Sequence, residues 1–106
     1  MNTRKWYAWL NLMPPRPDDF HVVGEVEVGN PGIVAELHTR TPQGINPDIL
    51  QLDLHLVQRP GIWVQVMTWT QSRYDRVLCP GMSGWKQVEV FHDGQRIALI
   101  DVDTVH

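Results

Sequence analysis

Five histidines and the carboxylates near them are the side chains best suited to chemistry in this sequence. Asp53 and His55 are two positions apart, so on a strand they share a face and could bind one metal ion. A third ligand must come from the neighbouring strand, where the predicted pairing places Gln65 and Met67, which are poor ligands for zinc or iron. A second candidate set consists of Asp101, Asp103 and His106, but it lies at the C-terminal end of the sequence, where chains tend to fray. The sequence therefore predicts no metal ion and no cofactor.

Candidate nucleophiles lack supporting residues in the sequence. Cys79 precedes Pro80, with no cationic neighbour that would stabilise its thiolate. Ser83 lies in Gly-Met-Ser-Gly without the helix that follows a nucleophile elbow. Acidic residues occur in pairs, but nothing in the pattern marks a pair as desolvated: Asp18 and Asp19, Glu25 and Glu27, Asp101 and Asp103. The sequence therefore favours a protein without enzymatic activity. A metal-dependent enzyme that uses one of the two candidate metal sets is an alternative.

Length and charge narrow the class of protein further. The chain has 106 residues, of which 42% are hydrophobic, and its formal net charge is -3. These values predict one globular domain, residues 1–106. Nine Lys and Arg residues, nearly all spread singly, argue against a nucleic-acid partner. A single cysteine, no secretory signal and no apolar run near about 20 residues predict a cytoplasmic protein without a membrane partner.

Alternating apolar residues predict β-strands along most of the chain. The clearest run places leucines at positions 50, 52, 54 and 56, and a second run spans residues 62–69. Pro60-Gly61 between the two runs predicts a hairpin in which Leu56 lies opposite Val64. Residues 22–28 and 33–37 form a second predicted hairpin around Asn30-Pro31-Gly32.

The two ends of the chain also show strand patterns. Asp93-Gly94 predicts a type I′ turn with Val90 opposite Ile97 and with Arg96 against the ring of Phe91. An opening strand is predicted over residues 6–12, followed by a loop over 13–19 because Pro14-Pro15 cannot donate to a sheet. Residues 41–48 are a predicted loop, and 71–84 are compatible with either a short helix or a strand.

About seven strands joined mostly by hairpins predict an all-β fold, specifically an antiparallel β-sandwich built from consecutive hairpins. The sandwich is favoured because each predicted strand has one consistently apolar face. A small Greek-key barrel is the alternative.

The most unusual feature of the composition is five tryptophans, not all of which fall on predicted core faces. Solvent-exposed apolar patches of that size are rare on monomers, and Tyr and Trp are enriched in protein–protein interfaces. The sequence therefore predicts a binding module that self-associates as a homo-oligomer, a dimer in the simplest case. The candidate ligand or interface residues are Tyr7, Trp9, Trp63, Met67, Trp69 and Tyr74.

An alternative function uses the same aromatic side chains as an open platform. Trp and Tyr rings stack on sugars and other small molecules, and Arg73, Tyr74 and Asp75 could supply hydrogen bonds beside them. On this hypothesis the chain is a small-molecule or carbohydrate binder.

Overall fold

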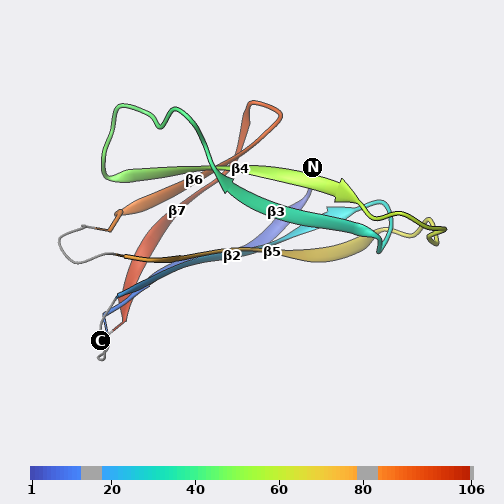
Figure 1. Ribbon diagram of the computed structural model, residues 1–106, viewed down its shortest axis with the longest axis horizontal. Coiled ribbons are helices and arrows are strands. Elements are labelled where there is room, and N and C mark those ends of the chain that lie inside the picture. The colour runs from blue at the N-terminus through green and yellow to red at the C-terminus, as the bar shows by residue number, and fades with distance from the viewer. Residues whose placement is uncertain (13–17, 79–83, 106) are drawn as a thin grey trace.

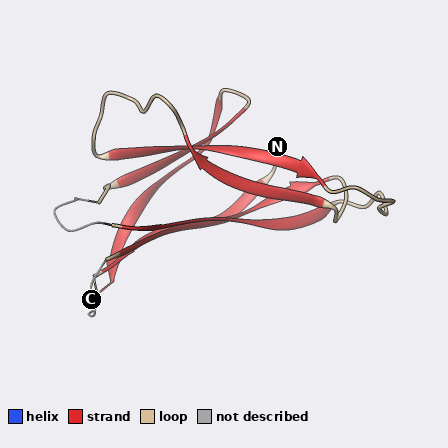
Figure 2. Ribbon diagram, viewed as in Figure 1, coloured by secondary structure: helices blue, strands red, loops and turns tan. Residues whose placement is uncertain are grey.

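The computed structural model describes residues 1–12, 18–78 and 84–105. These residues form seven strands and the loops that join them, and they contain no helix that could cross a membrane (Figure 2). The strands are β1 (Thr3–Asn11), β2 (Asp19–Val28), β3 (Ile33–Thr39), β4 (Ile49–Gln58), β5 (Thr68–Val77), β6 (Gln87–His92) and β7 (Gln95–Val105). The all-β expectation is confirmed.

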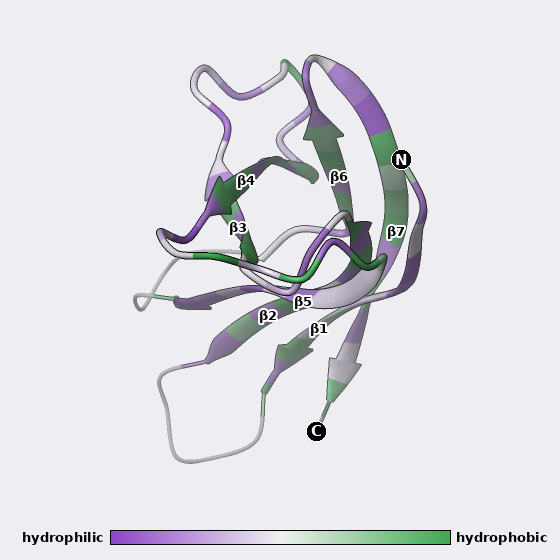
Figure 3. Cartoon of the chain, turned by 90° about the vertical axis from the view of Figure 1, so that its right-hand side faces the viewer, coloured by the Kyte–Doolittle hydropathy of each residue, from purple (hydrophilic) through white to green (hydrophobic). Residues whose placement is uncertain are grey.

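All seven strands belong to one sheet, in the order β3-β4-β6-β7-β1-β2-β5. Strand β7 joins the two halves, and the outermost strands β3 and β5 approach each other, so the sheet is nearly closed into a barrel (Figures 1 and 3). The sheet is mixed, because β1 pairs with β7 and β4 with β6 in parallel. The expected antiparallel arrangement is therefore correct only in part, and the continuous sheet does not show the two separate layers of a sandwich.

Two of the three predicted hairpins are wrong. β4 pairs with β3 and β6, whereas residues 59–67 form no strand at all. β2 pairs with β1 and β5, so Asn30-Pro31-Gly32 carries the chain from one half of the sheet to the other and makes no hairpin. Alternation identifies the buried face of a strand but does not identify its neighbour, and turn residues fit a crossing loop as well as a hairpin.

The hairpin between β6 and β7 is confirmed. Asp93 and Gly94 have φ values of 50° and 79°, as a type I′ turn requires, and Phe91 is opposite Arg96. Beyond this pair the register shifts, so Val90 lies opposite Ala98 and not Ile97. The extra residue is typical of a β-bulge, which the pattern of residue types did not reveal. With this shift, Gln87 lies opposite Asp101.

The remaining strand predictions have different outcomes. The opening strand is present as β1, with Ala8 buried and with Trp6 and Leu10 packed against the core. Residues 68–77 are a strand, which resolves the choice left open for the first half of the 71–84 segment, and 41–48 are a loop. Most of the predicted 13–19 loop lies outside the described residues, as do Cys79 and Ser83.

The core fills the interior of the barrel with one face of each strand. Phe20 and Val22 from β2, Leu50 and Leu52 from β4 and Val88 from β6 are all less than 2% exposed. The outward residues between them are polar on most strands, so the two faces are distinguished as the alternation predicts. Burial of each such aliphatic or aromatic side chain stabilises the fold by about 1.5–3 kcal/mol.

Gly24 lets the indole of Trp6 lie directly on the backbone of β2. A Cβ atom at this position would lie 2.2 Å from Cε3 of Trp6, closer than real Cβ contacts allow. The hydroxyl of Ser72 donates to the carbonyl oxygen of Gly24 at 3.2 Å, which ties β5 to the same point. A side chain at position 24 would therefore displace either the indole or the strand.

We predict that Gly24→Ala lowers the free energy of unfolding by about 1–3 kcal/mol, as overpacking does in other cores. Gly29→Ala is the matched control, since no atom lies within 4 Å of a Cβ there and Gly29 has no positive φ. Urea unfolding followed by far-UV circular dichroism measures both values. Equal stabilities for the two variants would contradict the close approach of Trp6.

Candidate functional site

All five tryptophans are half-buried, and each has a partner within its own chain. Trp6 lies on Gly24, and Trp63 lies on Gly32 with its Nε1 donating to the carbonyl oxygen of Arg59 at 3.0 Å. The other contacts are the Arg4 guanidinium 3.9 Å from the ring centroid of Trp69, the ring of Phe20 5.0 Å from that of Trp85, and the rings of Tyr7 and His21 beside Trp9. These contacts cover much of the aromatic surface that the sequence left unexplained.

One outward face, on β1, β2 and β5, carries a row of rings that ends in a charged cluster. Tyr7 and Trp9 are stacked with ring centroids 5.3 Å apart, and the His21 ring lies 4.9 Å from Trp9. His21 Nδ1 lies 2.5 Å from Oδ1 of Asp75, which also accepts from Nε of Arg73 at 3.0 Å. The strand register explains the row, since Trp9, His21 and Asp75 occupy matching positions on the three strands.

The structure places the residues of the predicted aromatic platform on two different faces of the sheet. It brings Tyr7 and Trp9 close to Arg73 and Asp75, as the carbohydrate hypothesis requires. Tyr74 points the other way, because it packs against the core and its hydroxyl lies 3.1 Å from Oγ1 of Thr39.

The largest group of exposed apolar side chains lies on the loop between β4 and β5, although Ile45, alone on the 41–48 loop, is also 104% exposed. Ile62 is 104% exposed, Val64 71%, Met67 63% and Val66 52%. We call residues 61–67 the apolar loop. Trp63 anchors it at Gly32, and Arg59 N donates to Gly32 O at 2.8 Å just before it. Figure 3 faces this loop and shows its hydrophobic stretches at the surface.

The sequence distinguishes this loop by its lack of charged residues, although its alternating pattern predicts a strand. No Asp, Glu, Lys or Arg occurs from residue 60 to residue 72, which is the longest stretch of the sequence without a charged side chain. Alternation in 62–69 resembles a strand, but only Thr68 and Trp69 belong to one. Residues 62–67 pair with no strand in the described residues, and Ile62, Val64 and Val66 face solvent.

A polar cleft of about 370 Å³ lies on the opposite half of the barrel. It is lined by Arg40, Thr41, Asp53, Leu54, His55, Phe91, Asp93 and Gly94. The Arg40 guanidinium lies 4.3 Å from the ring centroid of Phe91, and its Nη1 is 3.7 Å from Oδ1 of Asp53. The cation at Phe91 is therefore Arg40 and not the predicted Arg96, which instead pairs with Glu89 at 3.5 Å.

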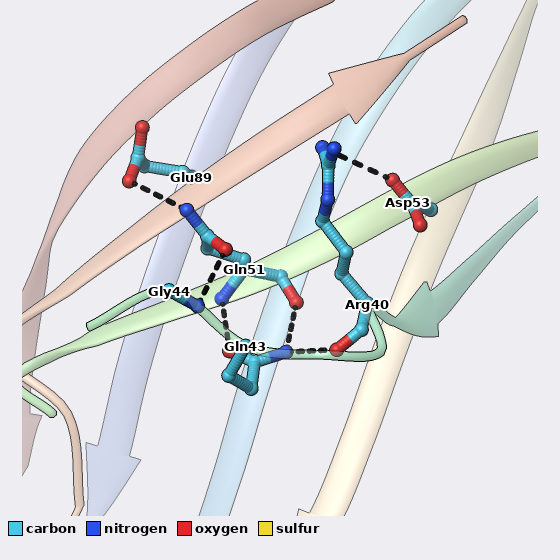
Figure 4. Close-up of polar contacts among 6 residues, drawn as sticks. All are labelled: Arg40, Gln43, Gly44, Gln51, Asp53 and Glu89. Carbon is cyan, nitrogen blue, oxygen red and sulfur yellow. Dashed lines mark hydrogen bonds and ion pairs between the residues drawn. The ribbon is translucent and has the colours of Figure 1, made fainter. Parts of the chain in front are cut away.

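Glutamine side chains hold the loop that carries Arg40. Gln43 Nε2 donates to the carbonyl oxygens of Arg40 and Gln51 at 2.5 and 2.9 Å, and Gln51 N donates back to Gln43 Oε1 at 2.8 Å (Figure 4). Gly44 N donates to Gln51 Oε1 at 2.9 Å. Residues 40–44 therefore have a defined position beside the cleft, although most of them are exposed.

The metal-ligand candidates have different neighbours from those expected. β4 pairs with β3, so Asp53 lies opposite His38 and not the predicted Met67. His55 lies opposite Glu36 and not the predicted Gln65. Among the described residues, no three His, Cys, Asp or Glu side chains are arranged to hold a metal ion. In the second set, Asp101 accepts from Nε2 of Gln87 at 3.0 Å, Asp103 contacts Tyr7, and His106 lies outside the described residues.

The chain matches no family model, no curated protein and no solved structure.

Two carboxylates on the β1–β2–β5 half, the exposed Asp75 and the half-buried Glu25, have pKa values below their usual range. Burial acts to raise the pKa of Asp75, but hydrogen bonds from Arg73 and His21 outweigh it. A hydrogen bond from Arg4 lowers the pKa of Glu25. A carboxylate whose pKa is depressed in the folded state stabilises the fold at neutral pH, and that contribution is lost as pH falls through the folded pKa.

We predict that Arg73→Gln raises the pKa of Asp75 toward its usual value and leaves the pKa of Glu25 unchanged. Arg4→Gln should have the converse effect, because each arginine acts on its own carboxylate. Carboxyl ¹³C NMR titration of the two variants measures both values. If neither substitution moves its own partner, these ion pairs are not formed in solution.

Proposed function

We propose that this protein is a non-enzymatic binding module that self-associates, as a dimer in the simplest case, through the apolar loop. The observation that carries the proposal is the concentration of exposed Ile62, Val64, Val66 and Met67 in one anchored segment. The tryptophan-rich strand faces suggested by the sequence are less suitable, since their rings already have partners within the chain. Met67 belongs to the proposed interface, and Trp63 anchors the apolar loop by packing on Gly32.

A second copy of this chain fits the loop better than a charged partner does. The stretch from 60 to 72 has no charged side chain that could form an ion pair with such a partner. Two apolar loops related by a two-fold axis present identical surfaces to each other, which is the usual geometry of a homodimer. A stable interface buries about 800 Å² on each partner. One short loop supplies only part of that area, so we expect dissociation in the micromolar range.

We predict that Val64→Asp and Ile62→Asp each convert the dimer to a monomer, because a carboxylate would be buried without a partner at the interface. Both side chains are exposed in the monomer, so the fold should be retained. Val77→Asp is the control: Val77 is 59% exposed but lies at the far end of β5, about 30 Å along the strand from the loop.

Sedimentation velocity over a range of micromolar concentrations measures the association of all four proteins. The proposal requires a dimer for the parent chain and Val77→Asp, and a monomer for the two loop variants. A parent chain that stays monomeric throughout, or loop variants that still dimerise, would exclude the apolar loop as the interface.

The polar cleft supports a second candidate function, the binding of a small polar molecule. Its volume of about 370 Å³ lies within the range of ligand pockets, roughly 300–1,000 Å³. Arg40 is the main ligand-binding candidate, because its Nη1 is buried and has no hydrogen-bond acceptor among the described residues. Thermal-shift screening of small carboxylates and amino acids against the parent chain and Arg40→Ala tests this function. A response equal in the two proteins would exclude the cleft.

A further inference from the structure

Four side chains with metal-binding donor atoms lie together on the outward face of β3 and β4. Glu36 is opposite His55, and His38 is opposite Asp53. The alternate residues on these strands, including Leu37 and Leu54, are buried in the core, so the four polar side chains share the solvent side. None of them is needed for the core or for the proposed dimer.

The spacing of three of these side chains is close to that of ligands on a single ion. His38 Nε2 lies 3.0 Å from Oε1 of Glu36, and the rings of His38 and His55 have centroids 4.9 Å apart. With metal–ligand bonds of about 2.0–2.1 Å, adjacent donor atoms in a tetrahedral site lie about 3.3 Å apart and two bound imidazole centroids about 5 Å apart. The three donors do not share one point in this structure, so a bound ion requires the exposed His55 side chain to rearrange toward His38 and Glu36.

The two carboxylates, Glu36 and Asp53, differ in their ion-pair partners. Asp53 is paired with Arg40, whereas Glu36 contacts only His38 among the ion pairs of the described residues. The available ligand set is therefore His38, His55 and Glu36, which leaves a fourth position for solvent. Two imidazoles with one carboxylate suit zinc and similar transition metals, and are not the oxygen-rich set that calcium or magnesium needs.

We infer that His38, His55 and Glu36 form a binding site for one divalent transition-metal ion of the zinc type. His55 also lines the polar cleft, so the proposed site adjoins that cleft. The ordinary alternative is a solvent-exposed ion pair between His38 and Glu36, with His55 packed beside it and no affinity for metal.

The test is a titration of the untagged 106-residue chain with Zn²⁺ in competition with a chromophoric chelator. We expect one equivalent to bind with a dissociation constant in the low micromolar range or tighter. His38→Gln and His55→Gln should each weaken binding at least tenfold, because each removes one of three ligands. His21→Gln, on the opposite half of the sheet, should bind as the parent chain does.

Substitution of Co²⁺ gives an independent readout, since a low-coordinate site produces a visible absorption band that an exposed ion pair cannot. The band should appear in the parent chain and in His21→Gln, and should be lost in His38→Gln. The inference is overturned if the parent chain binds no stoichiometric Zn²⁺, or if the His38 and His55 variants bind it as tightly as the parent. Either result would leave the dimer proposal unaffected, because the apolar loop shares no residue with this site.

Discussion

Strand β7 pairs with both halves of the sheet, and the barrel depends on this double pairing. Its first part, as far as Asp101, is antiparallel to β6, and its last part, from Val102 to Val105, is parallel to β1. An eleven-residue strand is long enough to pair with both neighbours in succession. Without it, each half would be a small open sheet with exposed strand edges, which are prone to association with other chains.

The continuous sheet separates the surface into regions with different chemistry. The face of β1, β2 and β5 carries stacked rings and ion pairs, whereas the face of β3 and β4 carries histidines, carboxylates and the polar cleft. The apolar loop lies at one end of the barrel, where β4 leaves one half and β5 enters the other (Figure 1). Association through the loop would therefore leave both strand faces accessible.

The tryptophans show how a chain rich in aromatic residues can leave little aromatic surface exposed. Glycines at 24 and 32 allow indoles to lie on the backbone, and the Arg4 guanidinium covers the ring of Trp69. None of these contacts is visible from residue spacing, because each joins residues far apart in the chain. The aliphatic residues of the apolar loop have no such cover, which is why the proposed interface moves from the rings to the loop.

The sequence by itself determined which side chains point into the core and which point out, because side-chain direction alternates locally along any strand. It also determined the turn at Asp93-Gly94, since positive φ at two adjacent positions depends on the residues at the turn itself. Only the tertiary structure decided which strands are neighbours, because backbone hydrogen bonds are alike for all residues and several pairings satisfy one alternation. For this reason Asp53 and His55 face His38 and Glu36, an arrangement that their own positions in the chain could not reveal.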